Sequence, residues 1–134
     1  MFFKYNWKGL LWALFILLLC GIPGSDIPHF QWMDFLSFDK FAHAGVFAVL
    51  VILGARGLAK QYEAQRSRSN PVLPVLLFAL AYSPLTEWLQ DIVFVERTAE
   101  FLDMLANWVG CFVGMWLYGR YFKYRSGAGK AAGI

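Results

Sequence analysis

The sequence has few charged residues for its length. Charged side chains make up 16% of the 134 residues, whereas soluble domains usually carry about 25%. Hydrophobic residues reach 59%, and the mean hydropathy is +0.49. A chain with so little charge cannot cover itself with polar surface, which excludes an ordinary water-soluble domain.

Cysteines are equally scarce. Cys20 and Cys111 both lie in apolar runs, and two thiols so placed form neither a disulfide framework nor the spacing of a metal site. We therefore expect both to act as small packing residues. The chain also lacks a glycine-rich phosphate loop, low-complexity segments and internal repeats, which argues against a nucleotide site and a repeat architecture.

Long apolar runs, by contrast, are present. A membrane-spanning helix needs about 20 mostly apolar residues, and four candidate spans lie at about 7–24, 40–58, 72–89 and 103–121. None shows the alternation of a β-barrel, so the sequence predicts an all-α, four-transmembrane-helix bundle. We expect residues 1–134 to form one membrane domain, with a flexible tail at 122–134.

The first apolar run has a second interpretation. A charged start followed by an apolar core is also typical of a signal peptide, and LLLCG resembles a lipoprotein cleavage box. However, Leu19 stands before the cysteine, where a small residue is normally required, and no A-x-A-like site follows. We favour a retained helix, and a cleaved signal peptide stays open as the alternative.

The two signs of charge lie at opposite ends of the spans. Ten of the twelve basic residues precede span one, separate spans two and three, or follow span four, and eight of the nine acidic residues lie at the other ends. The positive-inside rule therefore predicts that both termini are cytoplasmic and that loops 25–38 and 90–102 face outward. The scattered basic residues suit lipid head groups rather than nucleic acid.

Polar residues gather at the predicted outer ends of three spans. Spacings of three or four place two of them on one face of each helix. The pairs are Asp39 with His43, Glu87 with Gln90, and Asp103 with Asn107, with Lys40 beside the first pair and Arg97 in the outer loop. The deeper halves of the spans lack such residues, so a channel lining or a transmembrane proton pathway is not expected.

Three hypotheses stay open for these residues. They bind the head group of a phospholipid or a lipid-linked cell-wall precursor, with Arg97 and Lys40 pairing with its phosphate or carboxylate. Alternatively, they form a membrane enzyme in which His43, Glu87 and Asp103 carry the catalysis without a cofactor. Or they only join the helices by hydrogen bonds. A zinc site at the three catalytic candidates is disfavoured, because one histidine with carboxylates is a thin ligand set.

Further patterns concern packing. Pro84 lies within the third span and cannot donate to the carbonyl of Leu80, which predicts a local kink. Gly110 and Gly114 form G-x-x-x-G, which lets helices approach closely, and we expect this packing within the bundle rather than in a dimer. Aromatic residues suited to the membrane interfaces are Trp7, Trp12, Trp32, Trp88, Tyr118 and Tyr121.

At these motifs the sequence resembles the VanZ-like family of small bacterial membrane proteins. The likeness rests on DKFAH at 39–43, EWLQ at 87–90, and R-x5-D-x3-N-x2-G from Arg97 to Gly110. It covers about residues 26–117, and acidic residues beside the arginine depart from the family's pattern. The resemblance implies a multi-pass protein of the bacterial cytoplasmic membrane that acts in the cell envelope. The family's namesake is linked to teicoplanin resistance, and no particular reaction is implied.

Overall fold

The structure, a computed structural model, describes residues 2–20, 38–92 and 101–122. Within these residues the regular secondary structure is entirely helical. The helices are α1 (Phe2–Cys20), α3 (Phe38–Ala64), α4 (Val72–Ile92) and α5 (Phe101–Leu117), followed by the π-helical turn η2 (Tyr118–Phe122). Four helical segments in this part of the chain are long and apolar enough to cross a membrane. The predicted fold class, an all-α protein with four potential spans, is confirmed here.

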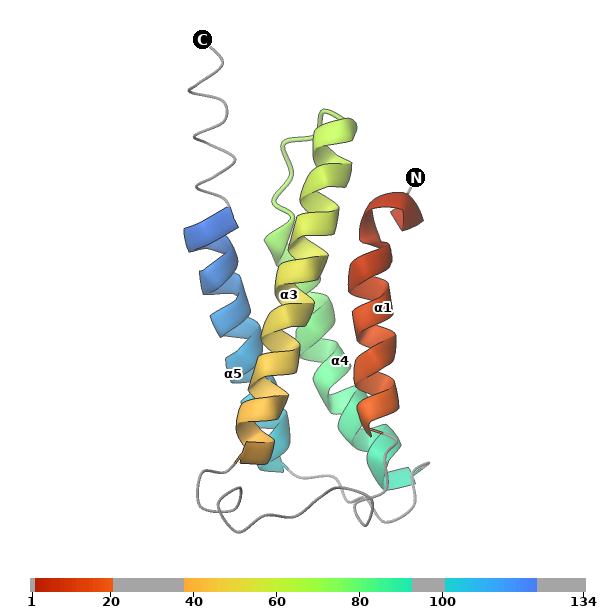
Figure 1. The fold of residues 1–134 in the computed structure, drawn as a ribbon, viewed down its shortest axis with the longest axis vertical. Coiled ribbons are helices and arrows are strands. Elements are labelled where there is room, and N and C mark those ends of the chain that lie inside the picture. The colour runs from red at the N-terminus through yellow and green to blue at the C-terminus, as the bar shows by residue number, and fades with distance from the viewer. Residues whose placement is uncertain (1, 21–37, 93–100, 123–134) are drawn as a thin grey trace.

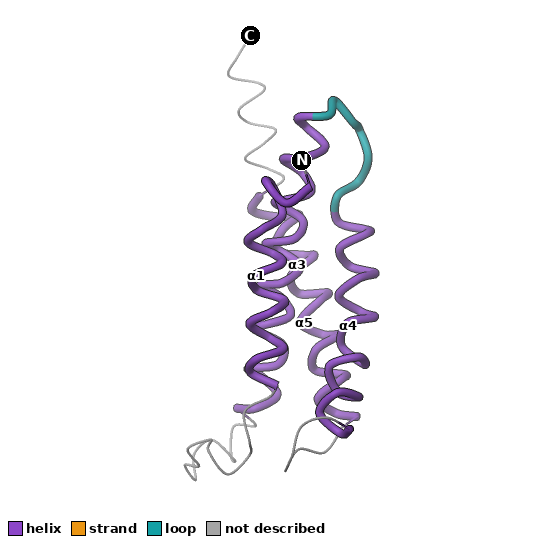
Figure 2. Tube along the Cα trace, turned by 90° about the vertical axis from the view of Figure 1, so that its right-hand side faces the viewer, coloured by secondary structure: helices purple, strands orange, loops and turns teal. Residues whose placement is uncertain are grey.

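The helices pack as an antiparallel bundle (Figure 1). The start of α1 and η2 lie at one end, together with the loop 65–71 that joins α3 to α4 (Figure 2). The starts of α3 and α5 and the end of α4 lie at the opposite end. The central helix is α3, because it contacts each of the others and packs most extensively on α5 and α1.

Apolar runs located the helices but not their ends. The helix of the second predicted span, α3, reaches Ala64, beyond its predicted end at 58, because AKQYEA at 59–64 contains good helix formers. Beyond it, Arg66 adopts a left-handed conformation with φ of 54°, and the Ser67 N–H donates to the Tyr62 carbonyl at 2.8 Å. This Schellman-type cap ends the helix after the apolar run.

Several sequence predictions fall outside the described residues. They concern residues 21–24 of the first predicted span, most of the two outward loops with Trp32 and Arg97, and the tail from 123. The side chains of Cys20 and Asp39 also lie outside the described part. Cys111 is fully buried, so its predicted role in packing is confirmed.

The burial pattern is the reverse of that in a water-soluble bundle. Large apolar side chains point outward on every long helix; the exposed fraction is 65% for Leu18, 70% for Phe41 and 68% for Phe101. The buried polar residues are Asn6, Ser83, Thr86, Glu87, Gln90, Asp103 and Asn107. An apolar exterior around a partly polar interior suits surrounding lipid, because water would disfavour such extensive exposed apolar surface.

Two glycines of α5 lie directly against α3. A Cβ at Gly110 would overlap the carbonyl group of Ala44, and one at Gly114 would lie 2.5 Å from the carbonyl oxygen of Ala48. The missing side chains therefore let the two backbones touch, as small residues do in membrane helix pairs. The prediction that G-x-x-x-G packs within the bundle is confirmed for this face.

The helix α4 continues through Pro84 because another helix replaces the lost hydrogen bond. Proline has no N–H to donate to the carbonyl of Leu80. Trp108 of α5 donates from Nε1 to this carbonyl oxygen at 3.1 Å, so the acceptor is satisfied in an apolar interior. The kink at this proline stays a prediction.

Two of the aromatic residues assigned to the membrane interfaces are directed into the bundle. Trp12 lies in the middle of α1 and donates from Nε1 to the carbonyl oxygen of Val46 at 2.8 Å. Tyr118 is buried. Both side chains therefore make contacts inside the bundle, and their assignment to the membrane interfaces stays a prediction.

We expect Gly110→Ala to lower the thermal midpoint of the purified protein, because the added methyl group pushes α5 away from Ala44. Overpacking of this kind typically costs about 1–3 kcal/mol. Gly45→Ala is the matched control, since a Cβ at Gly45 meets no described atom within 4 Å. Equal midpoints for the two variants would contradict the close contact.

A double-mutant cycle tests the bond between Trp108 and the carbonyl of Leu80. Trp108→Phe removes the donor and should lower the free energy of unfolding by about 0.5–1.5 kcal/mol. In a Pro84→Ala background the backbone N–H at position 84 can satisfy the same carbonyl, so the substitution should cost less. The measurement is reversible unfolding in mixed micelles. Equal costs in both backgrounds would show that the indole does not replace the missing donor.

Candidate functional site

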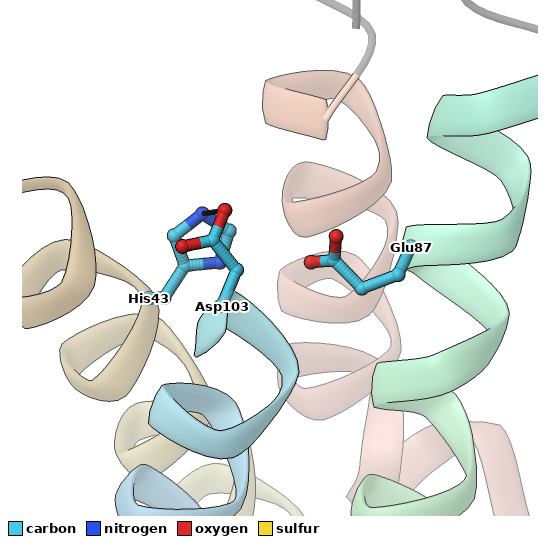
Figure 3. A group of neighbouring side chains, drawn as sticks. All are labelled: His43, Glu87 and Asp103. Carbon is cyan, nitrogen blue, oxygen red and sulfur yellow. Dashed lines mark ion pairs between the residues drawn. The ribbon is translucent and has the colours of Figure 1, made fainter. Parts of the chain in front are cut away.

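The candidate site lies where α3 and α5 start and α4 ends. The polar side chains of α4 repeat at i, i+3, i+4 and i+7, which places them on one face; they are the buried Ser83, Thr86, Glu87 and Gln90. Lys40 and His43 come from the first turns of α3, and Asp103 and Asn107 come from the first turns of α5. His43, Glu87 and Asp103 point toward one another from three helices (Figure 3).

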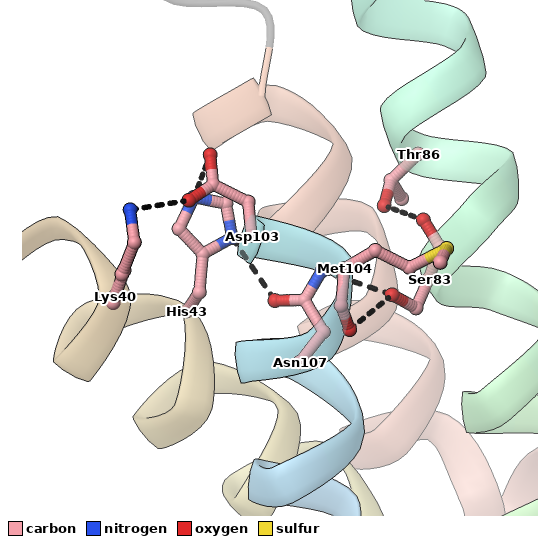
Figure 4. Close-up of polar contacts among 7 residues, drawn as sticks. All are labelled: Lys40, His43, Ser83, Thr86, Asp103, Met104 and Asn107. Carbon is pink, nitrogen blue, oxygen red and sulfur yellow. Dashed lines mark hydrogen bonds and ion pairs between the residues drawn. The ribbon is translucent and has the colours of Figure 1, made fainter. Parts of the chain in front are cut away.

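A chain of hydrogen bonds orients His43 (Figure 4). It ends on the carbonyl oxygen of Met104, which can only accept. Ser83 Oγ donates to this oxygen at 3.5 Å and accepts from Asn107 Nδ2 at 3.0 Å. Asn107 Oδ1 therefore faces His43 Nδ1 at 3.0 Å, and because an amide oxygen only accepts, Nδ1 carries the proton.

The other ring nitrogen of His43 faces Asp103. The distance from His43 Nε2 to Asp103 Oδ2 is 3.7 Å, and Lys40 Nζ lies 3.6 Å from Oδ1 of the same carboxylate. With Nδ1 protonated, neutral His43 directs a lone pair at a carboxylate that can only accept. Two acceptors in this arrangement need a positive charge between them, either a proton on Nε2 or a cation.

Both carboxylates of the site are withdrawn from solvent. Glu87 is 5% exposed and Asp103 is 7% exposed. Asp103 Oδ1 makes no hydrogen bond among the described residues, although the Lys40 ammonium lies nearby. Since the Lys40 side chain is 37% exposed, it forms the edge of the site and the carboxylates form its interior.

The structure brings four of the predicted site residues into one contact chain: Lys40, Asp103, His43 and Asn107. Glu87 joins them from α4, with its ligand atom within 4.8 Å of those of His43 and Asp103. Gln90 is buried on the same face of α4. The side chain of Asp39 and the whole of Arg97 lie outside the described residues, so their roles stay predictions.

Sequence reasoning did not include Ser83 and Thr86 in the site. Ser83 links Asn107 to the backbone of α5, and Thr86 donates to the Ser83 carbonyl oxygen at 2.8 Å. The polar repeat on an otherwise apolar α4 is the pattern that could have identified both residues. Because their hydroxyl groups bond to backbone carbonyls, they act as supports of the site.

A separate hollow lies between α1, α3 and α4 toward the other end of the bundle. It has a volume of about 440 Å³ and is lined mostly by apolar side chains such as Leu10, Leu50 and Phe78. Two of its polar lining residues, Asn6 and Gln61, hydrogen-bond each other at 2.7 Å. A lining without convergent ionisable groups makes this hollow a weaker candidate for chemistry than the site around His43.

Comparisons with known proteins assign no family to this chain. No family model matches the sequence, and no curated protein or solved structure matches it significantly. The resemblance to the VanZ-like family therefore stays a prediction from the three motifs. The function has to be argued from the site itself.

We expect the neutral ring of His43 to carry its proton on Nδ1. His29→Gln leaves His43 as the single histidine of the chain, so ¹⁵N NMR of the labelled imidazole can report its tautomer directly. With a chelator present and the imidazole neutral, the spectrum should show the Nδ1–H tautomer, and Asn107→Leu should shift it toward Nε2–H. An Nε2–H tautomer before the change at Asn107 would contradict the hydrogen-bond chain.

Proposed function

We propose that this chain is a VanZ-like protein of the bacterial cytoplasmic membrane that binds the phosphate-bearing head group of a lipid at the outer leaflet. The lipid is a phospholipid or a lipid-linked cell-wall precursor, which share this phosphate chemistry. One observation carries the proposal: ionisable side chains from three apolar helices converge at one end of the bundle, with His43, Glu87 and Asp103 inside and Lys40 at the edge.

Stability alone does not account for ionisable residues at this position. Hydrogen bonds between membrane helices contribute about 0.6 kcal/mol each on average. A charged residue costs about 2.5–3.5 kcal/mol at the membrane centre on insertion scales, and less toward the interface. Asn107 and Ser83 already join α5 to α4 with neutral groups at 3.0 Å. The charged groups are therefore better explained by a ligand than by packing.

The distribution of charge supports the proposed orientation. Basic residues predominate in the sequence around the start of α1, the loop 65–71 and η2, and these segments share one end of the bundle (Figure 1). The site lies at the opposite end. By the positive-inside rule the first end is cytoplasmic, so the site faces the outer leaflet and both termini are in the cytoplasm.

Lys40 is the described residue best placed to meet a phosphate. Its ammonium group lies 3.6 Å from Asp103, and its partly exposed side chain can turn toward a ligand. We expect Arg97 to join it from the outer loop, since guanidinium groups bind phosphate oxygens through paired hydrogen bonds. His43 and Asn107 would provide the less exposed polar contacts.

A membrane-embedded hydrolase or transferase acting on the same lipid is the second candidate. The observation that favours it is the bond from His43 Nδ1 to Asn107, which would orient Nε2, facing Asp103, as a general base. The group that orients the histidine would then be an amide rather than the expected carboxylate. A protein in which these residues only join the helices is the third candidate.

We expect Lys40→Gln and Arg97→Gln each to weaken the binding of phosphate-bearing lipids roughly 10-fold or more. Each change removes a charge-assisted hydrogen bond, which typically contributes about 1.5–3 kcal/mol. Mass spectrometry of the purified protein identifies and counts the retained lipids. Lys60→Gln is the matched control, because it removes an exposed cation from the other end of α3.

Together with His43→Ala and Glu87→Ala, the Lys40→Gln and Arg97→Gln variants separate the three candidates in cells that rely on this protein. Head-group binding predicts normal abundance and thermal stability with altered teicoplanin sensitivity. Unchanged lipid retention and unchanged sensitivity would rule it out. Turnover of an added lipid that disappears in His43→Ala would instead favour the enzyme. Loss of folded protein in both His43→Ala and Glu87→Ala would favour the purely structural role.

A further inference from the structure

We infer that His43, Glu87 and Asp103 form a binding site for a divalent transition-metal ion. Their potential ligand atoms, one from each of α3, α4 and α5, all lie within 4.8 Å of one another (Figure 3). Ligands around a tetrahedral zinc ion are about 3.3–3.6 Å apart, given metal–ligand distances of about 2.0–2.2 Å. Small side-chain rotations therefore suffice to close the site around an ion.

The orientation of His43 is an independent observation that points to a cation. A histidine that binds a metal usually donates its other ring N–H to a carbonyl or carboxylate oxygen. Here Nδ1 donates to Asn107 Oδ1 at 3.0 Å, which directs the lone pair of Nε2 toward Asp103 Oδ2, 3.7 Å away. That separation is too long for a hydrogen bond, and a metal ion would join the two ligand atoms.

The charge balance of the site also favours a cation. Asp103 is 7% exposed, whereas the Lys40 side chain, whose ammonium group lies 3.6 Å from Asp103 Oδ1, is 37% exposed. Asp103 Oδ1 makes no hydrogen bond within the described part of the chain. Buried charges are unfavourable unless they are paired or coordinate a metal, and a divalent ion would give Asp103 Oδ1 a buried partner.

The ligand set indicates which ions fit. One histidine with two carboxylates is the ligand set that the sequence alone disfavoured for zinc, but three converging protein ligands can hold Zn²⁺. The carboxylate oxygens also suit Mn²⁺, whereas a soft ion such as Cu(I) prefers sulfur ligands. Three protein ligands leave a coordination position for water or for a phosphate oxygen. The inference does not rest on the proposed lipid binding, because the three side chains supply the ligands without a lipid.

The test measures metal binding by the full chain in lipid-free detergent. After treatment with a chelator, Zn²⁺ or Mn²⁺ is titrated and followed by calorimetry. We expect one ion per chain with a Kd of about 10 μM or tighter. Asp103→Asn and His43→Gln each remove a ligand and should weaken binding by at least about 10-fold, and Asn107→Leu, which releases the ring, by about 10–100-fold.

Two further variants distinguish a metal site from a structural network. Lys40→Gln should tighten metal binding, because the ammonium group competes with the ion for Asp103. Glu63→Gln removes an exposed carboxylate near the other end of α3 and should leave binding unchanged. A purely structural network predicts no ion in the parent, so neither variant would alter binding.

The inference is overturned if the parent binds neither ion at concentrations on the order of 100 μM, or if Asp103→Asn and His43→Gln bind as tightly as the parent. Should a variant fail to fold, ¹⁵N NMR of the parent decides. Zn²⁺ should shift the Nε2 resonance of His43 while Nδ1 stays protonated, and unchanged resonances overturn the inference. Because no lipid is present, loss of head-group binding and loss of metal binding are separate results.

Discussion

The contact between α3 and α5 at Gly110 determines where the polar side chains of the site meet. Because this glycine has no side chain, the backbone of Ala44 lies directly against α5. His43 precedes Ala44 in the chain, and Asn107 and Asp103 lie about one and two turns before Gly110. The close approach thus brings the imidazole within 3.0 Å of the amide and 3.7 Å of the carboxylate. A packing feature of membrane helices sets the geometry of the site.

The position of α4 depends on hydrogen bonds from α5 rather than on touching backbones. Asn107 donates to Ser83 at 3.0 Å, and the adjacent Trp108 donates at 3.1 Å to the Leu80 carbonyl, which the proline of α4 leaves open. An unsatisfied backbone group in hydrocarbon costs several kcal/mol. These two bonds therefore favour one rotation of α4 about its axis, and Glu87, one turn after Ser83, then faces the site.

Sequence patterns predicted the helices, and which polar residues lie together at one end of the bundle, but they did not predict the contacts that support this arrangement. Apolar runs of about 20 residues identify potential spans without tertiary information, and spacings of three or four placed His43, Asp103 and Asn107 on inward faces. The roles of Trp12 and Trp108 could not be predicted, because an indole suits a membrane interface as well as a buried carbonyl. Ser83 was not assigned to the site, and its bond to Asn107 could not be predicted because a serine in a helix often bonds only to its own backbone.

The orientation of His43 links the helix packing to the chemistry of the site. Asn107 directs its amide hydrogens at Ser83 and its oxygen at the imidazole, and these neutral groups alone would join the helices. On the far side of the ring, the carboxylate of Asp103 faces His43 Nε2, so one acceptor faces another. A network that only joins helices does not need this arrangement. A positive charge is therefore required between them, either a proton on Nε2 or the proposed cation, while Lys40 lies at the edge, where it can meet an anion. Binding of a cation and binding of a phosphate are thus compatible, because a phosphate oxygen that completes the coordination of the ion also lies near the ammonium group.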